Sequence, residues 1–167
     1  MCQIFGNHWG YAENDLLYKS LPEMISELIH CRANNANFLL NVGPMGNEFL
    51  RPIDKAMMLE IGKWIRYNKG FIYEARHSNI SVENAILLKG EGKILYAVSE
   101  VPSKKDIVHG FSGDVVHVKL DAKIESAVWI DNGEPIEIID GCGYLTVPFK
   151  YGTNMVYRVA EIELDRS

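Results

Sequence analysis

Three aromatic residues near the start of this sequence are the first candidates for chemistry. Trp9, Tyr11 and Tyr18 lie in the stretch "GNHWGYAENDLLYKS", which has the composition of a loop. A flat aromatic ring in a loop can cover an apolar patch of a ligand. A single tryptophan is more often a core residue, so its position alone does not indicate a binding site.

Carboxylates close to this stretch are candidates for general acid–base or nucleophilic catalysis, which needs positioned side chains. The nearby acids are Glu13, Asp15, Glu23 and Glu48. None of them stands in a pattern that marks a catalytic group. We interpret each as a helix cap, a partner of a helix dipole or a solvated surface charge, and Asp54 and Glu60 in the same way.

The cysteines and histidines show no metal-site spacing. Cys2, Cys31 and Cys142 are far apart and form no CxxC, and the five histidines form no HxH or HExxH. We therefore expect three reduced thiols, no metal and no cofactor.

Charge and hydropathy limit the partners of this chain of 167 residues. Its net charge is −5 and it has no long basic run, so nucleic-acid binding by a basic face is disfavoured. No stretch approaches the roughly 20 apolar residues of a membrane span. Hydrophobic residues make up 47% and charged residues 23%, which predicts a packed core. We expect neither a nucleic acid nor a membrane as partner, and the sequence assigns no compartment.

Helical and extended patterns alternate in the first part of the chain. "SLPE" at Ser20–Glu23 has the form of a capping box and predicts a helix that ends near Arg32. The apolar run Phe38–Val42 predicts a strand buried on both faces. A second helix is predicted from Pro52 to Asn68. The expected apolar stripes are Met24, Ile25, Leu28 and Ile29 in the first helix, and Ile53, Met57, Ile61, Trp64 and Ile65 in the second.

Short alternating runs replace the helical spacing after Tyr73. Gly90-Glu91-Gly92 predicts a hairpin between 85–88 and 93–98. Further strands are expected at 115–120, 126–130, 136–139, 144–147 and 155–164, with turns at 131–133 and 140–143. Strands at such intervals are typical of an antiparallel β-sandwich.

The first part cannot form a core by itself. A strand apolar on both faces needs neighbouring strands on both edges, and only one strand is predicted there. This pattern looks like the last part of a βα repeat without its earlier units. An open strand edge recruits other chains, so we expect self-association through the region from Phe5 to Val42, as a symmetric dimer.

Four motifs in order give the chain a specific resemblance. "HWGY", "YKS", "NANFLLNVGP" and "LEIGKWIRYNKGFIY" follow one another as in the α-L-fucosidases of glycoside hydrolase family 29, over about Cys2 to Tyr73. The remainder resembles the C-terminal β-sandwich of those enzymes only in position and strand count. The sequence departs from the family pattern at "NAN", "NKGFIY" and "PMGNEFLRP", which lie in loops and caps.

The resemblance implies a fold of two parts. Residues 1–73 would be the closing βα units of a (β/α)8-like catalytic barrel, and residues 74–167 a C-terminal β-sandwich. "WGY" would be a loop at the carboxyl end of a barrel strand, where such barrels build their active sites. The aromatic ring at Trp9 would line the pocket for the fucose ring and its methyl group. The implied substrate is a fucosylated glycan or another α-L-fucoside.

The resemblance also implies that the catalytic groups lie elsewhere. Retaining glycosidases use two carboxyl groups about 5 Å apart. In the family, both the nucleophile and the acid/base precede the "WGY" loop, so this chain would contain neither and would be inactive alone.

A non-catalytic carbohydrate-binding or interaction module remains the alternative. Its candidate aromatic residues are Phe111, Trp129, Tyr144, Phe149, Tyr151 and Tyr157. Rings exposed together on one face would favour sugar binding, and buried rings would favour a structural domain.

Overall fold

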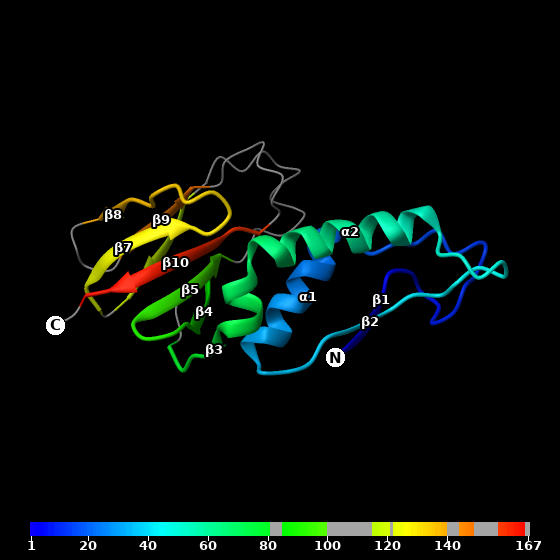
Figure 1. Cartoon of the computed structure of the whole chain (residues 1–167), viewed down its shortest axis with the longest axis horizontal. Coiled ribbons are helices and arrows are strands. Elements are labelled where there is room, and N and C mark those ends of the chain that lie inside the picture. The colour runs from blue at the N-terminus through cyan, green and yellow to red at the C-terminus, as the bar shows by residue number, and fades with distance from the viewer. Residues whose placement is uncertain (81–84, 100–114, 121, 140–143, 149–156, 166–167) are drawn as a thin grey trace. The chain divides into compact units, whose positions relative to one another are not determined.

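The computed structural model describes residues 1–80, 85–99, 115–120, 122–139, 144–148 and 157–165 (Figure 1). The chain forms two compact units, Met1–Arg66 and Tyr67–Ser167. Cys142, the expected turn at 140–143 and the start of the expected strand at 155 lie outside the described residues.

The first unit is built from parallel strands and helices. Its elements are β1 (Cys2–Ile4), α1 (Leu21–Ala33), β2 (Leu39–Asn41) and most of α2 (Pro52–Tyr67). β1 and β2 lie side by side and pair in parallel, with Cys2 opposite Leu39 and Ile4 opposite Asn41 (Figure 1). β1 was missed in the sequence because three residues carry too little periodicity to be recognised.

α1 forms where the capping box predicted it. The Ser20 hydroxyl accepts a hydrogen bond from the backbone N–H of Glu23, and the Glu23 carboxylate accepts one from the N–H of Ser20 at 2.6 Å. These bonds satisfy donors that a helix start leaves free. Met24, Ile25, Leu28 and Ile29 are buried, so the predicted apolar face is confirmed.

Two expectations for this unit are wrong. Leu39 is 54% exposed, so β2 is not buried on both faces. β2 also has one paired neighbour among the described strands, so one of its edges has no strand partner there. In α2, Ile61 and Trp64 are buried as expected, but Ile53 is exposed. Asp54 is buried instead, because it pairs with Arg51.

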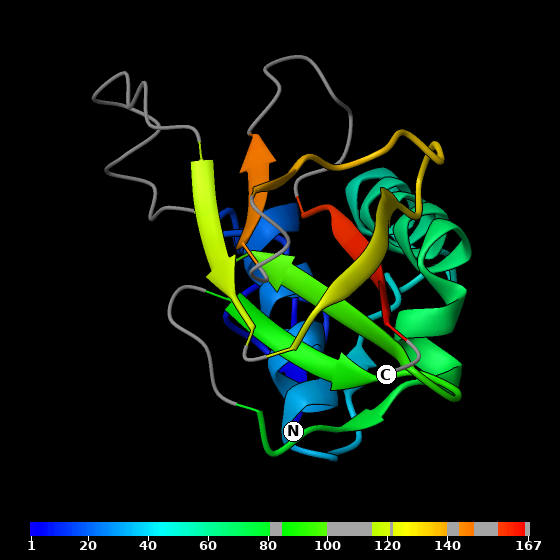
Figure 2. The ribbon, with the colours of Figure 1, turned by 90° about the vertical axis from the view of Figure 1, so that its left-hand side faces the viewer.

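The second unit is antiparallel. It begins with the π-helical turn η1 (Gly70–Glu74). One sheet has the strand order β3-β4-β5-β10-β7, and the other has the order β6-β9-β8 (Figure 2). The strand bounds are β3 (Arg76–His77), β4 (Ala85–Lys89), β5 (Ile94–Ser99), β6 (Val115–Lys119), β7 (Ile124–Trp129), β8 (Ile138–Ile139), β9 (Tyr144–Pro148) and β10 (Val159–Leu164). The predicted hairpin is β4–β5.

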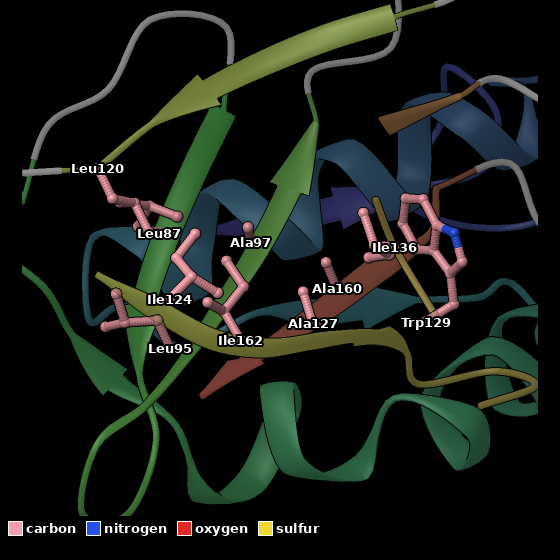
Figure 3. Close-up of a cluster of buried hydrophobic side chains, with 10 residues drawn as sticks. All are labelled: Leu87, Leu95, Ala97, Leu120, Ile124, Ala127, Trp129, Ile136, Ala160 and Ile162. Atoms are coloured by element: carbon pink, nitrogen blue, oxygen red, sulfur yellow. The ribbon is translucent and has the colours of Figure 1, made fainter. Parts of the chain in front are cut away.

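One hydrophobic cluster lies against the five-stranded sheet (Figure 3). Its members are Leu87, Leu95, Ala97, Leu120, Ile124, Ala127, Trp129, Ile136, Ala160 and Ile162. Ile138 of β8 packs against the cluster, so the second sheet contributes to it. Alternation along β5 and β10 brings Leu95 and Ala97, and Ala160 and Ile162, to one face. In β7 a register shift opposite Glu163 and Leu164 allows Ile124 to join Ala127 and Trp129.

The opposite face of the same sheet is also covered. Tyr96 and Val98 of β5 are buried there, and η1 approaches Tyr96 so closely that a Cβ on Gly70 would lie 2.5 Å from its hydroxyl oxygen. Burial, followed by the charges of Glu161 and Glu74, raises the pKa of Tyr96 to about 12. Gly70 is therefore needed for close packing at this position.

A buried ion pair fixes the turn after β7. Arg158 donates to both carboxylate oxygens of Asp131, at 2.9 and 2.8 Å. Its guanidinium carbon lies 4.3 Å from the centroid of the Trp129 ring. The Arg158 and Asp131 side chains are 7% and 11% exposed, so the pair is screened little by solvent.

Arg158→Lys should lower the free energy of unfolding by about 1–2 kcal/mol, because an ammonium cannot make the two-point contact with Asp131. Denaturant unfolding followed by circular dichroism measures the change. Lys123→Gln is the control, because it removes the exposed pair with Asp165 and should change little. Equal effects of the two substitutions would contradict a special role for Arg158.

Candidate functional site

Two loops meet beyond the carboxyl ends of the parallel strands. One follows β1 and spans residues 5–20, and the other follows β2 and spans residues 42–51. The Asn41 amide donates a 2.5 Å hydrogen bond to the backbone carbonyl of Trp9. Gly43 lies so close to the other loop that a Cβ there would collide with the backbone of Gly10 and Tyr11. The end of β2 therefore fixes the backbone at Trp9.

The loop 5–20 is closed at its base. Its first side chain, Phe5, is buried, and the N–H of Lys19 donates to the Phe5 carbonyl at 2.8 Å. The Lys19 ammonium also donates to the Gln3 side chain at 2.7 Å and to the Ile4 carbonyl at 2.9 Å. A loop whose ends are tied together in this way is compact and can hold its side chains in place.

Asp15 organises the interior of the loop. One of its carboxylate oxygens accepts hydrogen bonds from the N–H of Asn7 at 2.7 Å and the N–H of His8 at 3.2 Å. The same oxygen lies 3.1 Å from Nδ1 of His8. The backbone N–H of Asn7, with the His8 side chain, lowers the pKa of Asp15 below its usual value. A Cβ on Gly6 would collide with this carboxylate, so the contact requires glycine there.

Arg51 connects two tyrosines of this loop to the start of α2. Its guanidinium donates to Asp54, with a shortest distance of 2.9 Å, and Asp54 is 1% exposed. The same guanidinium carbon lies 5.6 Å from the centroid of the Tyr11 ring and 5.0 Å from that of the Tyr18 ring, within cation–π range. Burial, followed by the Asp54 charge, raises the pKa of Tyr18.

Trp9 differs from the other two tryptophans in its exposure. Its exposed fraction is 60%, whereas Trp64 and Trp129 are 2% and 3% exposed. The backbone of Trp9 is held by Asn41 while its ring remains open to solvent. An exposed ring on a fixed backbone is suited to stack against an apolar face of a ligand.

The candidate acids have mostly structural partners. Glu23 completes the capping box, as the sequence predicted, and Glu60 lies 3.8 Å from Lys63 at the surface. Glu13 and Glu48 are exposed. Of the three interpretations offered for these acids, the solvated surface charge is wrong for Asp15 and Asp54, because both are buried and paired. Asp54 lies in the first turn of α2, which agrees with the helix-dipole interpretation.

Three residues of this region were missed in the sequence. These are His8, Asn41 and Arg51, each of which contacts a partner in the loop or at its border. Arg51 directly precedes a helix, and Asp54 stands three residues later in its first turn. This spacing could have indicated their ion pair. The contact of Asn41 with Trp9 spans 32 residues, and no local pattern indicates it.

The aromatic residues proposed for the alternative module lie in the second unit. Trp129 is buried in the hydrophobic cluster, so it belongs to the core. Tyr157 is half-buried. Phe111, Phe149 and Tyr151 lie outside the described residues, and so does the side chain of Tyr144.

Neither a metal cluster nor a membrane helix is found in the described part of the chain. No group of three or more His, Cys, Asp or Glu side chains there could hold a metal ion. No described helix is long and apolar enough to cross a bilayer.

Residues 1–70 match the family model described as alpha-L-fucosidase. The resemblance to the α-L-fucosidases is confirmed. The tissue alpha-L-fucosidase of Bos taurus is 32% identical over 104 residues, which are 59% of this chain and 22% of that protein. The enzyme of Homo sapiens is 31% identical over 97 residues, 54% of this chain and 20% of the relative. The chain thus spans about a fifth of these relatives.

Solved fucosidase structures share the fold over nearly the whole chain. Alpha-L-fucosidase isoenzyme 1 from Paenibacillus thiaminolyticus has a TM-score of 0.77 at 24% identity, and the match covers 98% of this chain and 39% of that one. The alpha-L-fucosidase from Bacteroides thetaiotaomicron also has a TM-score of 0.77, at 22% identity, covering 98% and 37%. At these identities the likeness shows a shared fold.

Gly43→Ala should destabilise the contact between the two loops, because its Cβ collides with backbone that cannot move aside. We expect a loss of about 1–3 kcal/mol in the free energy of unfolding and shifted amide resonances at Trp9 and Tyr11. Gly46→Ala in the same loop is the control, since a Cβ there meets no atom within 4 Å. If both variants behave alike, the close approach at Gly43 is not a constraint.

Proposed function

We propose that the chain is the C-terminal part of a retaining exo-glycosidase that hydrolyses α-L-fucosides. The observation that carries the proposal is the exposed Trp9, held by Asn41 in a loop beyond the carboxyl ends of two parallel strands. This loop belongs to the segment that matches the α-L-fucosidase family. Active sites of (β/α)8 barrels are built from such loops.

The finer fold assignment is part of this proposal. Residues 1–73 are the closing βα units of a (β/α)8-like catalytic barrel, and residues 74–167 are a C-terminal β-sandwich. The order β1, α1, β2, α2 with a parallel strand pair supports the first assignment. Two antiparallel sheets that contribute to one apolar cluster support the second.

The proposed mechanism proceeds with retention through a covalent intermediate. A family 29 alpha-L-fucosidase from Bacteroides thetaiotaomicron has been trapped as a covalent intermediate with 2-fluoro-fucosyl fluoride. Such an intermediate requires a nucleophilic carboxylate and a second carboxyl group about 5 Å away. Asp15, Glu23 and Asp54 are already engaged in structural contacts here. The resemblance to the family implies that the nucleophile and the acid/base both precede the "WGY" loop, and we propose the same arrangement for the protein that carries this chain.

The chain alone should not hydrolyse an aryl α-L-fucoside, because one aromatic wall cannot replace a nucleophile and an acid. Release of nitrophenol from 4-nitrophenyl α-L-fucoside by the purified chain measures this. Glu13→Gln and Asp15→Asn serve as controls for contaminating enzyme. Turnover that survives purification and disappears in either variant would contradict the proposal.

In a complete enzyme that carries this chain, Trp9→Ala should weaken L-fucose binding by about 1–3 kcal/mol and change the unfolding temperature little. The C5 methyl group of fucose gives the sugar an apolar patch that the indole ring can cover. Calorimetric titration measures the affinity. Tyr73→Ala, which removes a ring that is 71% exposed and lies outside the loop, is the control. Unchanged affinity of the Trp9 variant would remove Trp9 from the pocket.

We propose a fucosylated glycan as the partner of the complete site, and self-association as a property of this chain by itself. β1 and β2 form a two-stranded sheet in the described residues, and Leu39 of β2 is 54% exposed. An unprotected strand edge with exposed apolar side chains recruits another chain. A symmetric dimer is the commonest closed result of such pairing.

Leu39→Lys should shift the chain toward a monomer, because a charged side chain on a strand edge opposes pairing. Sedimentation velocity at tens of micromolar measures the distribution. Leu59→Lys is the matched control, since Leu59 is 58% exposed and belongs to helix α2, not to a strand. A monomeric wild-type chain would contradict self-association.

A further inference from the structure

His8 combines an exposed ring with a fixed orientation. Its side chain is 65% exposed, yet Nδ1 lies 3.1 Å from a carboxylate oxygen of Asp15, whose side chain is 4% exposed. The backbone N–H of His8 is bound to the same oxygen at 3.2 Å. Main chain and imidazole are therefore both tied to one buried group, which restricts the ring although it faces solvent.

The contact with Asp15 decides which ring nitrogen carries the proton. Asp15 accepts from two backbone N–H groups, and a carboxylate in that position stays ionised. An unprotonated Nδ1 beside an ionised carboxylate would place two electron pairs against each other, so Nδ1 carries the hydrogen. In the neutral ring, Nε2 then holds a free electron pair and is a hydrogen-bond acceptor.

The position of His8 connects this acceptor with the proposed sugar site. His8 directly precedes Trp9, whose ring is exposed and whose carbonyl is fixed by Asn41. Both residues lie in the loop beyond the carboxyl end of β1. A sugar presents apolar C–H faces and hydroxyl donors, and the two neighbouring side chains offer one partner for each.

We propose that His8 is a second sugar-contacting residue of this loop. Its Nε2 accepts a hydrogen bond from a sugar hydroxyl, and Asp15 is the positioning residue that fixes the tautomer and orientation of the ring. The inference rests on the proposed function, because it places His8 in the site of Trp9. A purely structural His8 would affect the stability of the loop and leave sugar affinity unchanged.

The test uses the chain itself with ¹⁵N-labelled histidine. L-Fucose and 2-O-α-L-fucosyl-D-galactose are titrated into the millimolar range, and the ring nitrogens are followed by NMR. We expect the Nε2 resonance of His8 to move with sugar while Nδ1 remains protonated. A response to L-fucose assigns the hydroxyl to the fucose ring, and a response to the disaccharide alone assigns it to the second sugar.

Variants separate binding from structure. His8→Ala should raise the dissociation constant about three- to tenfold, the change expected for loss of one neutral hydrogen bond. His8→Gln should recover part of this loss, because its amide oxygen is an acceptor of similar reach. His30→Ala, which removes an exposed histidine on α1, is the control and should leave the affinity unchanged.

The outcomes distinguish this inference from the proposed function. If Trp9→Ala weakens binding while His8→Ala does not and Nε2 does not respond, His8 is no sugar contact and the proposed function stands. If neither variant alters the dissociation constant, or no resonance responds to either sugar, the inference about His8 is overturned, and the proposed function is decided separately by the Trp9→Ala titration in the complete enzyme. A loss of unfolding temperature in His8→Ala without a change in affinity would reduce His8 to a structural role.

Discussion

The first unit depends on the parallel pairing of β1 with β2. Three residues on each strand place Ile4 opposite Asn41, so both strands end at the same edge of the sheet. The loops 5–20 and 42–51 then leave from neighbouring points. Asn41 reaches the carbonyl of Trp9 because of this register. A shift by one residue would turn the Asn41 side chain to the other face of the strand and break the contact.

Buried charges stabilise the loop 5–20 and the start of α2. Asp15 inside the loop and Asp54 at the start of α2 are both nearly inaccessible to solvent. Burying a carboxylate costs free energy unless hydrogen-bond donors surround it, and both of these carboxylates have such donors. Asp15 receives backbone N–H groups and His8, while Asp54 receives the guanidinium of Arg51. The result is a loop whose backbone is held from within and whose Trp9 ring is exposed.

In the second unit, the order of the strands is set by pairing between segments that are far apart in the sequence. β10, the last strand, lies between β5 and β7 and pairs antiparallel with both. Ala160 and Ile162 of this strand reach the hydrophobic cluster, where they meet residues from β4, β5 and β7. The end of the chain is thus a central part of the sheet and contributes to the core of the unit.

Elements with local causes could be predicted from the amino-acid sequence. The capping box at Ser20 and Glu23 fixed the start of α1, and the glycines at 90 and 92 marked the hairpin β4–β5. The four motifs from "HWGY" to "LEIGKWIRYNKGFIY" identified the fucosidase resemblance, because motif order is a property of the chain. Local hydrogen bonds and turn preferences act between near neighbours, so they can be recognised without a fold.

The remaining features depend on contacts between distant segments of the chain. Tertiary structure created β1, exposed Ile53 and Leu39, buried Asp15 and joined Asn41 to Trp9. A short strand exists only through its partner, and the burial of a side chain depends on which distant segments lie over it. The acids near Trp9 could not be sorted into structural and solvated ones from their spacing, because their environments come from the fold around them.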